Sequence, residues 1–247
     1  MLEFVGIKKR FGDKTVLDDV SLSVPEGVVQ FVIGTSGTGK SVLMKHVVGL
    51  IRPDSGQVLV DGVDVARLSE RQFYAVRRHC GMVFQHSTLF DSMSLVDNVA
   101  LPIRKHSKLS RSEAHEQALA ALELVHMHSY AKRFPAELGA GLQKRAAIAR
   151  ALAMKPKYLV YDEPTTGLDP VAARRVDRLI REMADKTGVT SLVVSHDLTS
   201  ILSISDRIGL LYGGKLRFLG TADELRACED ALVRQFVSGA ATGPIVI

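Results

Sequence analysis

A glycine-rich loop is the first feature of the chain that can do chemistry. It follows an apolar run over residues 28–33, precedes a helical pattern over 42–48, and reads Gly34-Thr35-Ser36-Gly37-Thr38-Gly39-Lys40-Ser41. This is G-x-x-x-x-G-K-S in the strand–loop–helix setting that the pattern requires. Glycines let successive backbone N–H groups turn inward around phosphate oxygens, and the helix start adds a partial positive charge. We expect Lys40 to reach the β- and γ-phosphates and Ser41 to offer its hydroxyl to Mg²⁺; a glycine-rich turn that binds nothing is the alternative.

A pair of carboxylates supplies the acidic groups that the phosphate loop lacks. Asp162 and Glu163 end a second apolar run, Tyr158-Leu159-Val160-Tyr161. Alone, an Asp-Glu pair is usually a solvated turn. Beside a phosphate loop, an Asp at such a strand end holds the metal, and an adjacent Glu can polarise the attacking water as a general base. Together, the two elements predict a nucleoside triphosphatase.

Short β-rich runs separated by helical patterns indicate the α/β domain that positions these residues. The runs cover residues 2–6, 28–33, 57–60, 80–84, 158–161 and 190–194. Residues 111–127 follow Ser110, a suitable N-cap, and place apolar residues on one helical face. That helix lies in a block from about 88 to 154 without a strong strand pattern. We expect the block to be a helical subdomain inserted into the α/β core, and residues 238–247 to form an extended tail.

Composition excludes several classes of protein. The 247 residues are 46% apolar and 24% charged with a net charge of +5, near the averages for soluble globular proteins, so disorder and fibres are excluded. The longest stretches without charged residues, 27–39 and 235–247, have 13 residues each, too few to cross a bilayer. The first 25 residues contain no apolar core of a signal peptide. Cys80 and Cys228 give neither a disulfide framework nor a zinc site, which suits a reducing cytosol. No nucleic-acid partner is expected, because the positive charge is spread evenly.

Four further elements, in one order over residues 1 to about 225, resemble the ATP-binding cassette (ABC) family. Gln85, after Gly81-Met82-Val83-Phe84, is similar to the family's Q-loop glutamine. That match implies a residue that contacts Mg²⁺ and the attacking water and faces a transmembrane partner. Phe11 stands where the family stacks an aromatic ring on adenine, a contact of about 1–3 kcal/mol by analogy with base stacking. A core phenylalanine is the alternative.

The other two matches follow the carboxylate pair. Pro164-Thr165-Thr166-Gly167-Leu168-Asp169 resembles the D-loop that crosses the family's dimer interface, and Asp169 is counted with the nucleotide-binding residues. His196, at the end of an apolar strand, matches the switch histidine that senses the γ-phosphate, although a solitary histidine is more often structural. The resemblance implies ATP and Mg²⁺ as cofactors. Its catalytic residues would be Lys40, Gln85, Glu163 and His196, and its metal ligands Ser41, Gln85 and Asp162.

The signature element departs from the family pattern. Family members usually read Leu-Ser-Gly-Gly before a basic helix, and this chain reads Leu138-Gly139-Ala140-Gly141. In the family, this loop touches the γ-phosphate of ATP bound by the other subunit of a head-to-tail dimer. Gly139 removes the serine hydroxyl, which costs about 0.5–1.5 kcal/mol for one neutral hydrogen bond, roughly tenfold in rate. Ala140 is expected to restrict φ and crowd the approach. We predict a slowed ATPase that still binds nucleotide through the amides of Gly139, Ala140 and Gly141; normal turnover is the alternative.

The resemblance also implies an architecture and a working assembly. The fold would be a P-loop NTPase (RecA-like) core with an N-terminal antiparallel β-subdomain and the inserted helical subdomain, together an ABC nucleotide-binding domain over residues 1–237. Two copies would sandwich two ATPs, and hydrolysis would require closure of the homodimer. Apolar residues over 84–103 predict a docking place for a partner's helix, unless they fill the subdomain's own core. The apolar end of the tail, 244–247, is predicted to reinforce the dimer.

Several segments are similar to the ATPase subunits of Mla/Mce-type phospholipid transporters. These segments are 73–78, 85–102, 195–198, 204–206, 233–239 and 243–244. The match implies a peripheral protein on the cytoplasmic face of the inner membrane, bound to integral membrane permease subunits and an Mce-domain substrate-binding protein, with phospholipid cargo handled by these partners. The alternatives are the ATPase of an amino-acid-type importer, a non-transport ABC protein acting on DNA or ribosomes, and a nucleotide-gated assembly module with little turnover.

Overall fold

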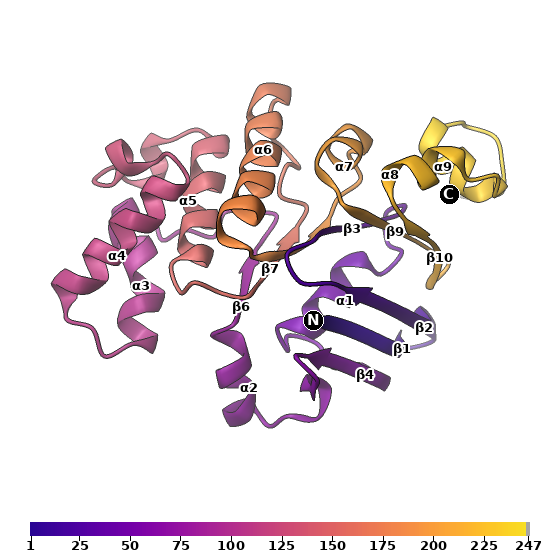
Figure 1. Ribbon diagram of the computed structural model, residues 1–247, viewed down its shortest axis with the longest axis horizontal. Coiled ribbons are helices and arrows are strands. Elements are labelled where there is room, and N and C mark those ends of the chain that lie inside the picture. The colour runs from indigo at the N-terminus through magenta and orange to yellow at the C-terminus, as the bar shows by residue number, and fades with distance from the viewer. Residues whose placement is uncertain (246–247) are drawn as a thin grey trace.

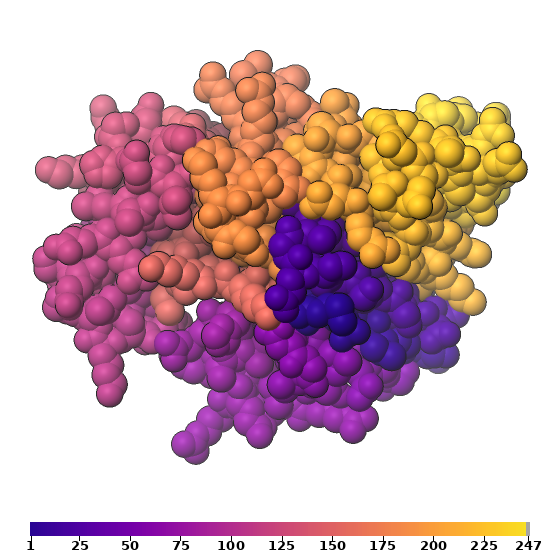
Figure 2. All heavy atoms as spheres, viewed as in Figure 1, coloured from indigo at the N-terminus to yellow at the C-terminus, as the bar shows by residue number. Residues whose placement is uncertain are grey.

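The computed structural model describes residues 1–245, which form two sheets with helices packed around them (Figure 1). The space-filling view places the helices of residues 95–152 at one end of the molecule and the segments that follow residue 221 at the other (Figure 2). The predicted α/β class with an antiparallel β-subdomain is confirmed.

The first sheet is antiparallel and comes from the N-terminal part of the chain. Its strands are β1 (Leu2–Phe11), β2 (Lys14–Val24), β4 (Ser55–Val60) and β5 (Val63–Asp64), in the order β2-β1-β4-β5. Leu2 and Phe4 of β1 are buried and Val5 is exposed, because successive strand residues face opposite sides. A register shift between Phe4 and Ile7 returns Ile7 to the buried face. β1 runs beyond the predicted 2–6, so Phe11 lies at its end.

The second sheet is mostly parallel and buried. Its strands are β3 (Val29–Ile33), β6 (Cys80–Val83), β7 (Tyr158–Asp162), β8 (Thr190–Val194), β9 (Arg207–Tyr212) and β10 (Lys215–Gly220), in the order β10-β9-β3-β8-β7-β6. Only β10 pairs antiparallel with its neighbour. The carboxyl ends of parallel strands meet at one edge of a sheet. The segments after β3, β6, β7 and β8 therefore lie along one edge, and these segments carry the predicted site.

Helices cover both faces of the parallel sheet. They are α1 (Lys40–Val47), α2 (Glu70–Arg77), α6 (Pro170–Thr187), α7 (Leu198–Ile204), α8 (Ala222–Ala227) and α9 (Ala231–Ser238), with a 3-10 turn η1 (Val65–Arg67). Alternate residues of β7 face opposite sides of the parallel sheet and belong to two different hydrophobic clusters. Tyr158 packs with α1 and the antiparallel sheet, and Tyr161 packs with α6 and α7.

Residues 95–152 contain helices and no strand. They form α3 (Leu95–His106), α4 (Arg111–Leu124) and α5 (Ala140–Leu152), with 3-10 turns η2 (His128–Tyr130) and η3 (Pro135–Glu137) between them. Ser110 begins α4 through a capping box with Glu113. Leu122, Ile103 and Ile148, one from each helix, are fully buried in one cluster that continues to the parallel sheet. This packing fixes α5, and with it the signature loop, against the sheet.

The C-terminal tail folds back and is not extended in its described part. The side-chain amide of Gln235 in α9 donates to the carbonyl oxygen of Ala240 at 3.1 Å and accepts from the N–H of Ile245 at 2.6 Å. Residues 246 and 247, which belong to the predicted apolar end, lie outside the described residues. No helix in residues 1–245 is long and apolar enough to span a bilayer.

Candidate active site

The phosphate loop, residues 34–39, joins β3 to α1. It packs closely against β2 and β9. Gly39 has a φ of +97°, and a Cβ there would lie 2.8 Å from the side chain of Leu17 in β2. A Cβ on Gly34 would collide with the carbonyl oxygen of Leu211 in β9. Only glycine fits both positions. The loop therefore presents its backbone to the space above it, together with the N-terminus of α1, and this arrangement binds anions.

The ammonium group of Lys40, the first residue of α1, binds carbonyl oxygens of this loop. Nζ donates to the carbonyl oxygens of Gly34 at 3.0 Å and Thr35 at 2.8 Å, and the side chain is buried. Burial lowers the pKa of Lys40, and the nearby carboxylates of Glu163 and Asp162 partly oppose that shift. A buried cation within an anion-binding loop is suited to binding a phosphate oxygen.

Ser41 and Asp162 supply two oxygen atoms at one point. The Ser41 hydroxyl donates to Oδ1 of Asp162 at 2.7 Å. Hydroxyl and carboxylate oxygens are hard ligands of the kind Mg²⁺ accepts, so the pair fits this ion. Within residues 1–245, no group of three or more His, Cys, Asp and Glu forms that could hold a metal. Mg²⁺ is commonly held by one or two protein carboxylates together with substrate phosphates and water.

Glu163 and His196 meet although they follow different strands. His196 Nδ1 lies 3.2 Å from Oε2 of Glu163, and the same oxygen accepts a 2.8 Å hydrogen bond from the Thr166 hydroxyl. Glu163 has a φ of +47°, uncommon for a residue with a side chain. Both side chains line a hollow of about 380 Å³ with Lys40. The structure thus brings together three predicted catalytic residues from the ends of β3, β7 and β8.

Phe11 lies at the mouth of an adjoining hollow of about 300 Å³, which residues 36–42 and Glu163 also line. Its ring is 48% exposed, so it is not the core phenylalanine of the alternative interpretation. The ammonium of Lys9 lies 5.3 Å from the ring centroid on one side. An exposed ring beside the phosphate loop can stack on a base.

Gln85 lies apart from these hollows. It follows β6, its side chain is exposed, and among the described residues it is not one of those that line either hollow. Its main-chain carbonyl oxygen accepts a 2.6 Å hydrogen bond from Nζ of Lys144.

The signature residues are also distant from the phosphate loop of their own chain. Gly139, Ala140, Gly141 and Asp169 line a separate hollow of about 360 Å³. The Asp169 carboxylate caps α6 and accepts from the N–H groups of Val171 and Ala172. Within one chain, these four predicted nucleotide-binding residues do not meet Lys40.

Gly139 and Ala140 cause no strain within the chain. Gly139 is the N-cap of α5 without a side-chain hydrogen bond, and a Cβ there would meet no atom within 4 Å. Ala140 is the first residue of the helix, a conformation that alanine adopts readily, so the expected restriction of φ has no effect here. Gly141 differs, because its Cβ would lie 2.9 Å from the Cβ of Ala172. Its packing against α6 requires the glycine.

Comparison with known proteins identifies the family. The ABC transporter family model matches residues 17–166. This chain belongs to the ABC transporter family. It is an ABC ATPase, and ATP hydrolysis in this family is coupled to transport.

Relatives of this ABC ATPase match along nearly its whole length. It is 40% identical over 234 residues to the "Intermembrane phospholipid transport system ATP-binding protein MlaF" of Escherichia coli K12, covering 95% of this chain and 87% of that one. It is 38% identical over 244 residues to the "Probable ribonucleotide transport ATP-binding protein mkl" of Mycobacterium leprae, covering 99% and 70%. Among solved structures, it matches the dimeric cassette MJ0796 bound to ADP and Pi with a TM-score of 0.81 at 29% identity, covering 90% and 99%. The cbiO1 protein of Clostridium perfringens matches with a TM-score of 0.85 at 28% identity, covering 95% and 93%.

Sequence reasoning missed three residues around the site of this ABC ATPase. Lys144 and Arg150 of α5 bind the segment after β6, and Phe236 of α9 lines the hollow that contains Glu163 and His196. Lys144 and Arg150 lie in a basic helix, and basic residues in a helix usually face solvent, so the sequence gives no sign of their partners. Phe236 has the helical spacing from Val233 that is typical of core residues, so no local signal marks it.

Proposed function

We propose that this ABC ATPase powers phospholipid transport between the inner and outer membranes as the ATPase subunit of an Mla/Mce-type transporter. The observation that carries the proposal is the 40% identity to MlaF, over 95% of this chain. The name of the mycobacterial relative makes ribonucleotides the second candidate cargo.

In the proposed mechanism, the protein positions ATP and stabilises charge. Backbone amides of residues 34–39 and the Lys40 ammonium bind the β- and γ-phosphates, and Phe11 stacks on adenine. Ser41 and Asp162, together with Gln85, would hold Mg²⁺, and the ion would supply positive charge to the phosphates.

Glu163 is the proposed general base. Its Oε2, oriented by Thr166 and His196, accepts the proton of the attacking water. The water oxygen attacks the γ-phosphorus, the bond from that phosphorus to the β–γ bridging oxygen breaks, and ADP leaves. His196, whose Nδ1 lies 3.2 Å from Oε2 of Glu163, would contact the γ-phosphate. The hollow that Lys40, Glu163 and His196 line together supports these roles.

A second copy of the chain completes each proposed site. The loop of Gly139–Gly141 and the Asp169 segment lie in their own hollow, away from Lys40. A head-to-tail homodimer would place the signature loop of one copy over the ATP of the other. The solved dimeric cassette that this chain matches at 29% identity supports this arrangement. The domain assignment of residues 1–237, with its helical subdomain at about 88–154, is part of the proposal.

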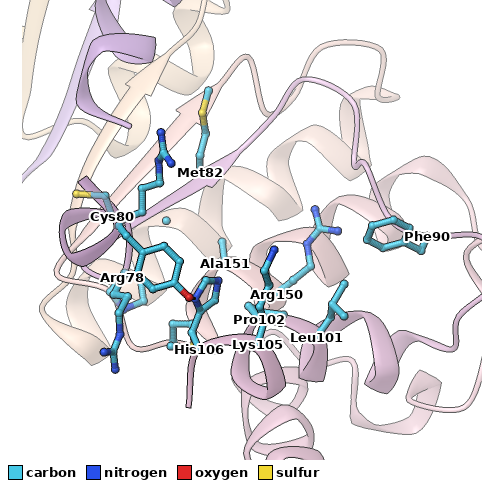
Figure 3. Close-up of a pocket in the computed structure, with 15 residues that line it drawn as sticks. Arg78, Cys80, Met82, Phe90, Leu101, Pro102, Lys105, His106, Arg150 and Ala151 are labelled. Atoms are coloured by element: carbon cyan, nitrogen blue, oxygen red, sulfur yellow. The ribbon is translucent and has the colours of Figure 1, made fainter. Parts of the chain in front are cut away.

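A basic groove is the proposed docking place for the permease, with which ABC ATPases pair. It measures about 490 Å³ and lies between β6, α2, α3 and α5 (Figure 3). Phe90, 50% exposed, and Leu101 provide apolar surface, whereas Leu95 and Val99 of the same stretch fill the core. The basic residues in its lining are Arg77, Arg78, Lys105 and Arg150, and no Asp or Glu of the described residues lines it. Charge complementarity favours a permease helix that carries acidic side chains.

The proposed assembly is peripheral, on the cytoplasmic face of the inner membrane, with permease subunits and an Mce-domain protein as partners. The test is purification of the tagged chain from its native membrane, followed by mass spectrometry of co-purifying subunits and lipids. Phospholipid and an Mce-domain subunit are expected. Their absence from an intact complex, or enrichment of ribonucleotide instead, would overturn the proposal. Arg78→Glu should lose the permease, whereas Lys108→Glu, on an exposed loop, should retain it.

A further inference from the structure

A buried ammonium group binds the start of the segment that carries Gln85. Lys144 is 2% exposed, and its Nζ donates to the carbonyl oxygen of Phe84 at 2.7 Å and to that of Gln85 at 2.6 Å. Burial lowers the pKa of Lys144 to about 8, although the Asp162 carboxylate opposes the shift. Burying an ammonium group is unfavourable unless it is hydrogen-bonded, and here two main-chain carbonyls satisfy it. Those carbonyls would in turn lack a charged donor without it.

A second basic residue of the same helix holds the far end of this segment. Arg150 donates from Nη1 to the carbonyl oxygen of Thr88 at 2.8 Å, and from Nη2 to the Thr88 hydroxyl at 2.9 Å and the carbonyl oxygen of Ser87 at 3.4 Å. Residues 84–88 are therefore bound to α5 at both ends by charge-assisted hydrogen bonds. Arg150 also lines the basic groove, where Figure 3 shows its side chain.

The helix that holds this segment is the one that begins at the signature loop. Gly139 is the N-cap of α5, Ala140 is its first residue, and Lys144 follows one turn later. We propose that α5 clamps residues 84–88 through Lys144 and Arg150, so that Gln85 and the signature loop move as one body. Lys144 is then a positioning residue that acts through Gln85. This inference rests on the role of Gln85 in the proposed function.

The clamp itself is tested by hydrogen exchange, without reference to activity. In Lys144→Met, the amide of Phe90, which donates to Oδ1 of Asn98 at 2.7 Å, and those of the adjoining residues 85–89 are expected to exchange at least about tenfold faster than in the parent protein. Lys108→Met, the same substitution on an exposed lysine, should leave their exchange unchanged. Unchanged exchange in a folded Lys144→Met protein would overturn the clamp. If that variant does not fold, Arg150→Gln provides the same measurement.

The positioning role is tested by a double-mutant cycle of ATPase activity. Lys144→Met is expected to lower kcat about tenfold with the KM for ATP changed less than twofold. In a Gln85→Ala background, the same substitution should lower kcat less than twofold, because the residue through which it acts is gone. Equal fold-changes in both backgrounds would overturn the positioning role. A Gln85→Ala protein with full activity would instead contradict the proposed role of Gln85, and the exchange result would still decide the clamp.

Discussion

Nδ1 of His196 lies 3.2 Å from Oε2 of Glu163, across the edge of the sheet where β8 and β7 end. The Thr166 hydroxyl donates to the same oxygen at 2.8 Å. Two groups from different segments thus orient one carboxylate in the hollow that also contains Lys40. A carboxylate oriented before substrate arrives needs little rearrangement to accept a proton.

Replacement of Glu163 by glutamine tests the proposed base. The amide keeps the size of the side chain but accepts no proton, so kcat should fall by about 10²- to 10⁴-fold while ATP still binds. Closed, ATP-bound dimers should accumulate, which light scattering coupled to gel filtration detects. Glu116→Gln, on an exposed face of α4, is the matched control. Steady-state phosphate release at the parent rate in Glu163→Gln would rule out the role.

Restoration of the signature serine tests whether the divergent loop slows the enzyme. Because a Cβ at Gly139 meets no atom within 4 Å, Gly139→Ser fits without repacking. Gly139→Ser/Ala140→Gly is expected to raise the ATPase rate roughly tenfold, the equivalent of about one hydrogen bond. The serine cap of α5 should raise the free energy of unfolding by only a few tenths of a kcal/mol, and Ala140→Gly in the first turn should offset that gain. Equal rates for the parent and the variant would show that the loop does not limit turnover.

The buried His46 should make stability depend on pH. Burial lowers its pKa, the hydrogen bond to Val42 and the Asp54 carboxylate oppose that shift, and Lys9 adds to it. Its Nε2 is buried without a partner among the described residues. The unfolded chain therefore takes up a proton near pH 6.5 more readily than the folded protein. The stabilisation is present above pH 6.5 and is lost as the pH falls through the folded pKa.

Urea unfolding between pH 7.5 and pH 5 measures this effect. One proton contributes a slope of at most ~1.4 kcal/mol per pH unit. His46→Leu should reduce the slope of the free energy of unfolding against pH by up to that amount. The remaining histidines contribute equally in both proteins. An identical slope for the parent and His46→Leu would mean that His46 titrates as it does in the unfolded chain.

Local sequence was sufficient for the parts of the site that are contiguous. The phosphate loop and Asp162-Glu163 each combine an apolar strand with the chemistry that follows it, and His196 was recognised by its place at a strand end. The parallel sheet then brings their side chains together, because its strands end at one edge. The fold class followed from the same alternation of strands and helices.

Other features depend on contacts between distant parts of the chain. Lys144 meets the carbonyl oxygen of Phe84, 60 positions away, and nothing near Lys144 in the sequence indicates that partner. The predicted strands did not include β2, because Asp18-Asp19 interrupts its pattern, although Val20, Leu22 and Val24 alternate with serines after that point. The tail was predicted to be extended, yet it folds onto Gln235, because one amide side chain can satisfy two backbone groups.

Phe236 connects the C-terminal helix to the active site. Its half-buried ring lines the hollow beside His196 and Leu198, away from Phe11 and the proposed adenine position. Phe236→Ala should let water into this side of the hollow and loosen the imidazole. We expect kcat to fall by up to about tenfold, ~1.4 kcal/mol in the barrier. The KM for ATP should change less than twofold, because the base-binding side is intact.

Steady-state ATPase assays of Phe236→Ala and Phe236→Leu separate this role from simple packing. Leucine still fills most of the space, so Phe236→Leu should retain most of the activity. Leu232 lies in the same helix and packs on the same core without lining the hollow, so Leu232→Ala is the matched control. A general loosening of α9 would lower kcat equally in Leu232→Ala and Phe236→Ala. A larger effect at Phe236 alone, at equal thermal stability, would place the ring at the active site.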